Sequence, residues 1–200
     1  MDIVFNSIYA RACMGAGLAV LAGLRAFLPV AFLALYSRVS FFSAPHLGGT
    51  PFAFLEKTWV ISLLFALAVI ELSVDKIPPF AEIRDQVMQP IKILLGGMVF
   101  AAAVAPQGWI VMSVCGVLGM VIAGLADRAR AAMRPDAEKA GTGAILLLSI
   151  YEDVATLVGT LFFVLLPLIG ALVALFSFLL TYRIRQRRRR KHKGLRILKG

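Results

Sequence analysis

The chain has 200 residues, of which 60% are hydrophobic and 16% are charged, and its net charge at pH 7 is +10. Soluble domains carry about 25% charged residues, so this composition excludes an ordinary soluble globular protein and indicates a membrane protein. A chain of this length has room for one compact membrane domain and for no large soluble domain besides.

Apolar segments of spanning length recur along most of the chain. A transmembrane helix needs roughly 20 residues to cross a hydrocarbon core about 30 Å thick. The sequence therefore predicts an all-α fold, a polytopic transmembrane helical bundle. Hydropathy predicts six spans, at about residues 14–37, 58–75, 91–106, 108–126, 142–163 and 166–182. An acid follows an apolar run in both the second and the fifth span, which is compatible with a 3+3 inverted repeat.

The connection over residues 76–90 is bracketed by prolines. Pro78 is expected to end the second span, because proline disrupts a helix interior. Between the prolines, apolar residues recur at helical spacing among charged ones, which predicts a short interfacial helix near residues 80–89. A plain polar loop is the alternative.

The positive charge is concentrated at the C-terminus. Residues 183–200 hold ten basic residues and no acid, so the sequence divides into a transmembrane domain over 1–182 and a basic tail over 183–200. Basic segments stay on the cytoplasmic side of a membrane, and an even number of spans then places both termini in the cytoplasm.

The tail is expected to contact membrane lipids with anionic head groups. No aromatic residues interleave its charges as single-strand binders require, so no nucleic-acid partner is expected. A homodimer is the other partner compatible with so small a bundle. The residues expected at the lipid head groups are Arg187, Arg188, Arg189, Arg190 and Lys191.

Charged residues inside the predicted spans are the candidates for function. A charge in hydrocarbon is costly unless it is paired or hydrated, so such residues mark functional sites. Arg25 lies in the first span, and Pro29 is expected to break that helix just after it and to free backbone groups there. Glu71 and Asp75 lie on the second span and Lys76 follows it directly. Glu152 and Asp153 lie on the fifth span.

These residues support two functions. Arg25 could bind an anionic group or hold an acid, while the acids carry protons or a cation, in a small transporter or lipid translocator. Alternatively, the charges are interhelical salt bridges in a non-transporting structural or partner-binding membrane protein. Four acids exceed what one bridge needs, which favours transport.

Enzymatic chemistry has little support. The sequence lacks an HExxH zinc motif and a GxSxG nucleophile elbow. Cys13 and Cys115 lie far apart and have no metal-binding spacing. No catalytic residue, metal or cofactor is expected.

Several motifs together resemble a known family. They are AGLRAFLP (22–29), ELSVDKIP (71–78), the QP-containing loop that follows, and the YEDV segment (151–154). Over about residues 15–180 the chain resembles DUF4126, a family of small bacterial multi-span membrane proteins of unknown function. The resemblance implies the bacterial cytoplasmic (inner) membrane as location. It implies no activity, and it singles out Arg25, Pro29, Glu71, Asp75, Lys76, Pro78, Glu152 and Asp153.

Deleting residues 187–200 should weaken binding to anionic lipid and leave the bundle folded. Each basic residue near the membrane surface contributes about 1 kcal/mol, and salt screens that attraction. Native mass spectrometry with phosphatidylglycerol and phosphatidylcholine measures the preference. An unchanged preference in the shortened protein would contradict a lipid-binding tail.

Overall fold

A computed structural model describes residues 7–74, 81–133 and 137–197. Over these residues the fold is all-helical, as predicted, with seven α-helices and no strand. Asp75, Lys76 and Pro78 lie outside the described residues. The helices are α2 (Ile8–Leu24), α3 (Phe27–Arg38), α4 (Thr58–Val74), α5 (Ala81–Val104), α6 (Trp109–Met133), α7 (Ala137–Leu165) and α8 (Pro167–Ile197), with 3-10 turns at Ala53–Glu56 and Ala105–Gln107.

The first predicted span is broken, as Pro29 suggested. Its pyrrolidine ring collides with the carbonyl of the residue four positions earlier, which is Arg25, and it cannot donate a hydrogen bond to that carbonyl. Accordingly α2 ends at Leu24 and Arg25 has extended backbone angles. Pro29 itself lies in the first turn of α3, where a missing N–H costs nothing.

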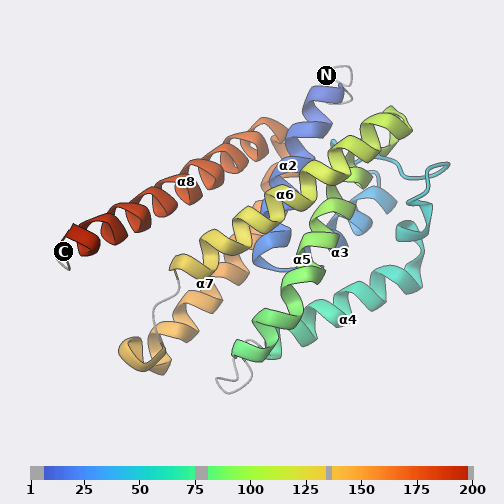
Figure 1. Cartoon of the computed structure of the whole chain (residues 1–200). Helices are drawn as coiled ribbons and strands as arrows, with labels where there is room; N and C mark the ends of the chain where they lie inside the picture. Colours follow the sequence, from blue (N-terminus) through green and yellow to red (C-terminus); the bar gives the residue numbers. More distant parts are fainter. Residues whose placement is uncertain (1–6, 75–80, 134–136, 198–200) are drawn as a thin grey trace.

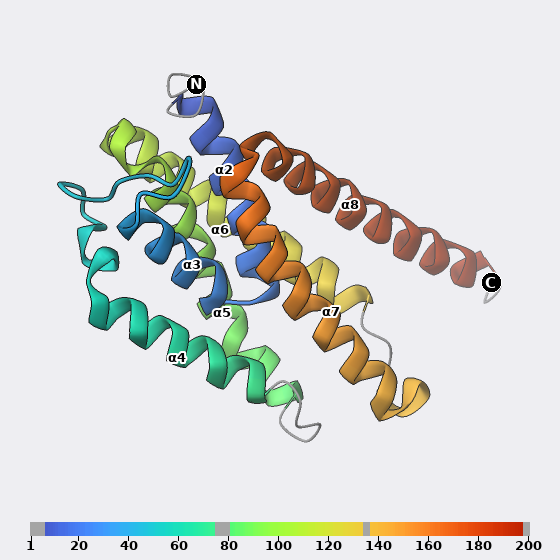
Figure 2. The same cartoon turned by 180° about the vertical axis from the view of Figure 1, so that it is seen from behind.

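The prediction of one span over 14–37 is wrong in its path, because α3 turns back beside α2. The Oγ of Ser43 lies 3.9 Å from the Sδ of Met14 in the first half of α2. Were α3 to continue along α2, Arg38 would lie about 36 Å beyond Met14. The five residues from Arg38 to Ser43 reach at most about 18 Å. The two helices therefore form a hairpin, which Figure 2 shows from behind, and Arg25 lies at its turn.

Helix α2 is the centre of the bundle. It contacts α3, α5, α6, α7 and α8, and eleven of its 17 residues are buried. Small residues permit this close packing. A Cβ on Gly17 would lie 2.5 Å from the Cα of Gly170 in α8, and one on Gly23 would lie 2.5 Å from the carbonyl oxygen of Ala123 in α6.

Contacts at both ends of the helices show that they alternate in direction. Helix α3 begins beside Glu71 near the end of α4 and ends beside Glu56 just before α4, so the two are antiparallel. In α7, Gly159 packs on Leu21 and Phe163 on Gly17, so α7 opposes α2.

Seven alternating helices place the start of α2 and the end of α8 at opposite ends of the bundle (Figures 1 and 2). The prediction of two cytoplasmic termini assumed an even number of passes, and this arrangement does not supply it. The 3+3 repeat stays a prediction.

Two further segments are longer helices than expected. The segment near 80–89 is helical, but it forms the first turns of α5, which continues through Pro90. The predicted separate interfacial helix is therefore not found. The tail is likewise helical to Ile197 and continues α8, whose second half extends away from the bundle (Figure 1). The predicted lipid-contact residues 187–191 lie on this extension.

The surface of the bundle is compatible with a membrane protein. Two stretches among the described residues, Val87–Gln107 and Trp109–Ala132, are long and apolar enough to cross a membrane. Large apolar side chains are exposed along the outer faces of several helices, which soluble monomers avoid. They include Leu63 and Ile70 on α4, Val117 and Val121 on α6, and Leu172 and Leu175 on α8.

The hairpin makes a testable prediction about sidedness. In a protein whose two native cysteines are replaced by serine, Tyr9→Cys and His46→Cys should react with a membrane-impermeant maleimide from the same side. Gln186→Cys, at the far end of α8, should react from the opposite side. Labelling of Tyr9→Cys and Gln186→Cys from one side would contradict the hairpin.

Candidate functional site

Arg25 is fully buried at the turn of the hairpin. It follows α2 directly, and its side chain is 1% exposed. A buried cation is stable only where acids and hydrogen-bond acceptors surround it. The packing of α2 against α7 supplies them, because α7 passes the turn with its polar segment.

Three residues of α7 bind the Arg25 guanidinium. Asp153 forms a close ion pair with it, and Glu152 has a carboxylate oxygen 3.8 Å from its Nη2. The same Nη2 donates to the hydroxyl of Ser149 at 3.0 Å and to the Ser149 carbonyl at 3.3 Å. The structure thus brings Arg25, Glu152 and Asp153 together, as the expected Arg25–acid pair requires.

Glu152 connects this group to a second one. Its Oε2 accepts a hydrogen bond of 2.8 Å from Nε of Arg130 in α6. Arg130 also lies 3.9 Å from Asp127, one turn earlier, and Asp127 pairs with Lys92 of α5 at 2.8 Å. The result is a continuous ion-pair chain, in the order Asp153, Arg25, Glu152, Arg130, Asp127 and Lys92.

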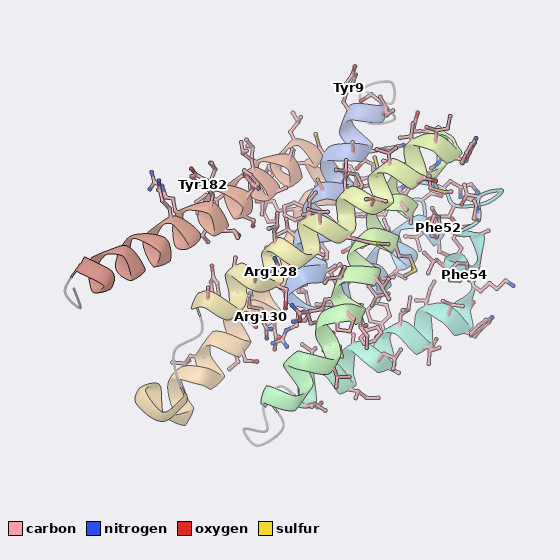
Figure 3. All side chains as sticks on the ribbon, viewed as in Figure 1. Tyr9, Phe52, Phe54, Arg128, Arg130 and Tyr182 are labelled. Atoms are coloured by element: carbon pink, nitrogen blue, oxygen red, sulfur yellow. The ribbon has the colours of Figure 1, made fainter. Side chains whose placement is uncertain are left out.

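The ion-pair chain alternates in sign and is neutral as a whole. The side chains of its three cations are each no more than 2% exposed, and those of its acids are 8 to 18% exposed. The central acids, Glu152 and Asp127, each lie between two cations. The chain links the turn after α2 with α5, α6 and α7. Figure 3 shows Arg130 among the helices, whereas Tyr9 and Tyr182 project from the surface.

Glu71 has a different role from the other acids. The hairpin turn exposes the first backbone N–H groups of α3, and Ala26 and Phe27 donate to the two carboxylate oxygens of Glu71 at 2.9 and 3.2 Å. A carboxylate at a helix N-terminus satisfies orphan donors and complements the helix dipole. Glu71 of α4 thereby fixes the turn that presents Arg25.

Sequence reasoning missed half of the ion-pair chain. Lys92, Asp127 and Arg130 are not among the residues that the sequence singles out, yet all three are buried. One signal was present for two of them: Asp127 and Arg130 are three apart on a helix and can share a face. Lys92 is a charged residue in an otherwise apolar segment and lies two residues after Pro90.

The other polar residues of α7 do not join the ion-pair chain. The hydroxyls of Thr156 and Thr160 are buried but donate to carbonyls of their own helix. Tyr151 is exposed. In the described part of the chain, no three His, Cys, Asp or Glu side chains are grouped to hold a metal ion. His46 is exposed on its loop.

A cavity of about 510 Å³ adjoins the ion-pair chain between α2, α6, α7 and α8. Its wall is almost wholly apolar. Two members of the ion-pair chain, Arg130 and Glu152, also line it. The site thus combines charges that can exchange partners with space for an apolar group.

Residues 12–187 match the family described as Domain of unknown function (DUF4126). The chain belongs to the DUF4126 family. No curated protein and no solved structure matches this DUF4126 protein. The family resemblance is therefore confirmed over most of the chain, while the chemistry must be argued from the geometry.

Arg25→Ala should destabilise the DUF4126 protein by about 3–5 kcal/mol, because it leaves buried acids without their cation. Adding Asp153→Asn should recover part of that loss. Thermal unfolding in detergent micelles measures both. Arg128→Ala is the control, because Arg128 is exposed on α6 and surface changes usually stay within about 0.5 kcal/mol. Equal melting temperatures for Arg25→Ala and Arg128→Ala would contradict a structural role for the buried pair.

Proposed function

We propose that this DUF4126 protein is a small transporter or lipid translocator of the bacterial inner membrane and that the ion-pair chain is its working site. The main support for the proposal is the ion-pair chain, in which six side chains of alternating charge lie beside the break between α2 and α3. Transporter sites are typically built where helices are interrupted and their ends face a polar interior.

A purely structural role is the alternative, and the number of charges argues against it. Well-packed apolar residues of similar volume commonly stabilise a protein as much as a buried ion pair does. One bridge would join two helices, whereas this protein connects three buried cations with two buried acids and the partly buried Asp153. Buried ionisable groups in membrane helices mark ion and proton pathways.

The mechanism follows from shared partners. Glu152 lies 2.8 Å from Arg130 and 3.8 Å from Arg25, so a small movement transfers it from one cation to the other. A proton or a charged group that enters at one position can thus be accommodated by exchange along the ion-pair chain, without leaving a buried charge unpaired.

The charges of the chain also orient the proposed transporter. The basic tail continues α8, so the end of the bundle that holds the end of α8 is cytoplasmic by the positive-inside rule. The start of α2 and the connection between α3 and α4 then face the opposite side. The turn at Arg25 points towards the cytoplasm.

Proton movement into liposomes of bacterial polar lipids that contain the full-length protein tests the proposal, with an internal pH-sensitive dye and an imposed pH gradient. The wild type should dissipate the gradient faster than empty liposomes. Asp153→Asn should fold, because Arg25 keeps Glu152 and Ser149, and should be at least tenfold slower. The double variant Arg25→Gln/Asp153→Asn should be equally slow.

Arg128→Gln, which removes an exposed charge on α6, is the matched control and should behave as the wild type. Each variant is accepted only if its melting temperature shows a folded protein. A folded double variant with wild-type proton movement would support the structural alternative and end the proposal. Wild-type liposomes no faster than empty ones would end the proposed movement of protons along the ion-pair chain.

A further inference from the structure

The cavity beside the ion-pair chain has the size and lining of a site for one long apolar chain. It measures about 510 Å³, within the range of roughly 300–1,000 Å³ typical of ligand sites. At about 30 Å³ for a group the size of a water molecule, this is room for about 17 such groups. Leu21, Phe162, Phe163, Val173 and Phe176 form much of the wall.

The cavity reaches the outer surface between α7 and α8. Phe162 is 45% and Phe176 is 64% exposed although both line it. Apolar side chains also dominate the exposed faces of α7 and α8 around it, including Leu157 and Leu172. A ligand can therefore enter sideways from an apolar surrounding, as a lipid would from a bilayer.

One part of the wall is charged. Arg130 and Glu152 line the cavity and form the centre of the ion-pair chain, and Arg130 is 3% exposed. Arg130 is also held by Asp127, so it stays in place when another anion binds it. Glu152 has Arg25 within 3.8 Å as its second cation. An anionic head group can thus take the place of Glu152 on Arg130.

We propose that the cavity binds a single-chain amphiphile with an anionic head group. Its hydrocarbon chain lies among the phenylalanines, and its head group binds Arg130. The assignment rests on the proposed function, because it names the cargo of the same site. The geometry of a guanidinium matches both a carboxylate and a phosphate. The head group of a fatty acid and that of a lysophospholipid can therefore bind Arg130 in the same way. Basic residues farther along α8 attract anionic lipids to this region.

Equilibrium binding to the full-length protein in detergent micelles tests the site, with three radiolabelled probes: palmitate, lysophosphatidic acid and the uncharged monoolein. Palmitate or lysophosphatidic acid should bind at least tenfold more tightly than monoolein. Tighter binding of palmitate identifies a carboxylate head, and tighter binding of lysophosphatidic acid identifies a phosphate head. Equal binding of all three would overturn the anionic head group.

Ser177→Phe and Ala155→Phe fill the cavity from α8 and α7 and should each weaken binding of the preferred probe at least tenfold. Ser113→Phe makes the same change on the exposed face of α6 and should leave binding unchanged. Arg130→Gln should remove the preference for anionic probes, and Arg130→Lys should restore part of it. The cavity variants decide the matter even if the Arg130 variants fail to fold.

The proton-movement assay separates this inference from the proposed function. Wild-type binding in both folded cavity variants, with normal proton movement, overturns the site and leaves the function. Binding that the cavity variants abolish, with no proton movement by the wild type, leaves the site and overturns proton transport along the ion-pair chain.

Discussion

The burial of Arg25 is the constraint on which the rest of the structure depends. A guanidinium with 1% exposure needs anionic partners from outside its own helix. Asp153 and Glu152 provide them only if α7 packs antiparallel on α2, and Glu152 in turn requires Arg130 of α6. Each further acid or cation follows from the one before it, so that a single buried charge ties the hairpin turn to three more helices through one neutral ion-pair chain.

The hairpin turn is the second element of this arrangement, and it arises from local chemistry. Pro29 prevents a continuous helix at Arg25, and the freed N–H groups of Ala26 and Phe27 would be costly if unsatisfied. Glu71 satisfies both from α4. The helix break and the capping acid thus act together on Arg25. The turn presents Arg25 to α7, and Glu71 holds the turn in place.

The ion-pair chain and the cavity are adjacent, and that adjacency gives the site its functional meaning. A series of salt bridges alone is compatible with a structural role. An apolar cavity alone is compatible with imperfect packing or with a lipid contact. Here Arg130 and Glu152 belong to both. An apolar chain inserted from the side brings its head group to a pair that can exchange partners, which is what a transporter of amphiphiles requires.

The sequence by itself determined the fold class and much of the site. Its apolar segments form the helices, and Pro29 breaks the first predicted span at Arg25. Because a buried charge needs a partner, the sequence predicted that Arg25 pairs with an acid, and the structure pairs it with Glu152 and Asp153.

The path of the chain and the full set of buried charges depend on contacts between distant residues, so only the tertiary structure shows them. Hydropathy cannot distinguish a kinked span from a hairpin, because it reports the apolar content of a segment and not its direction. The fold-back is seen in tertiary contacts such as the one between Ser43 and Met14. Lys92, Asp127 and Arg130 lie near the ends of apolar segments, where the sequence does not mark them as buried. The packing of α5, α6 and α7 shows that they are buried in one ion-pair chain.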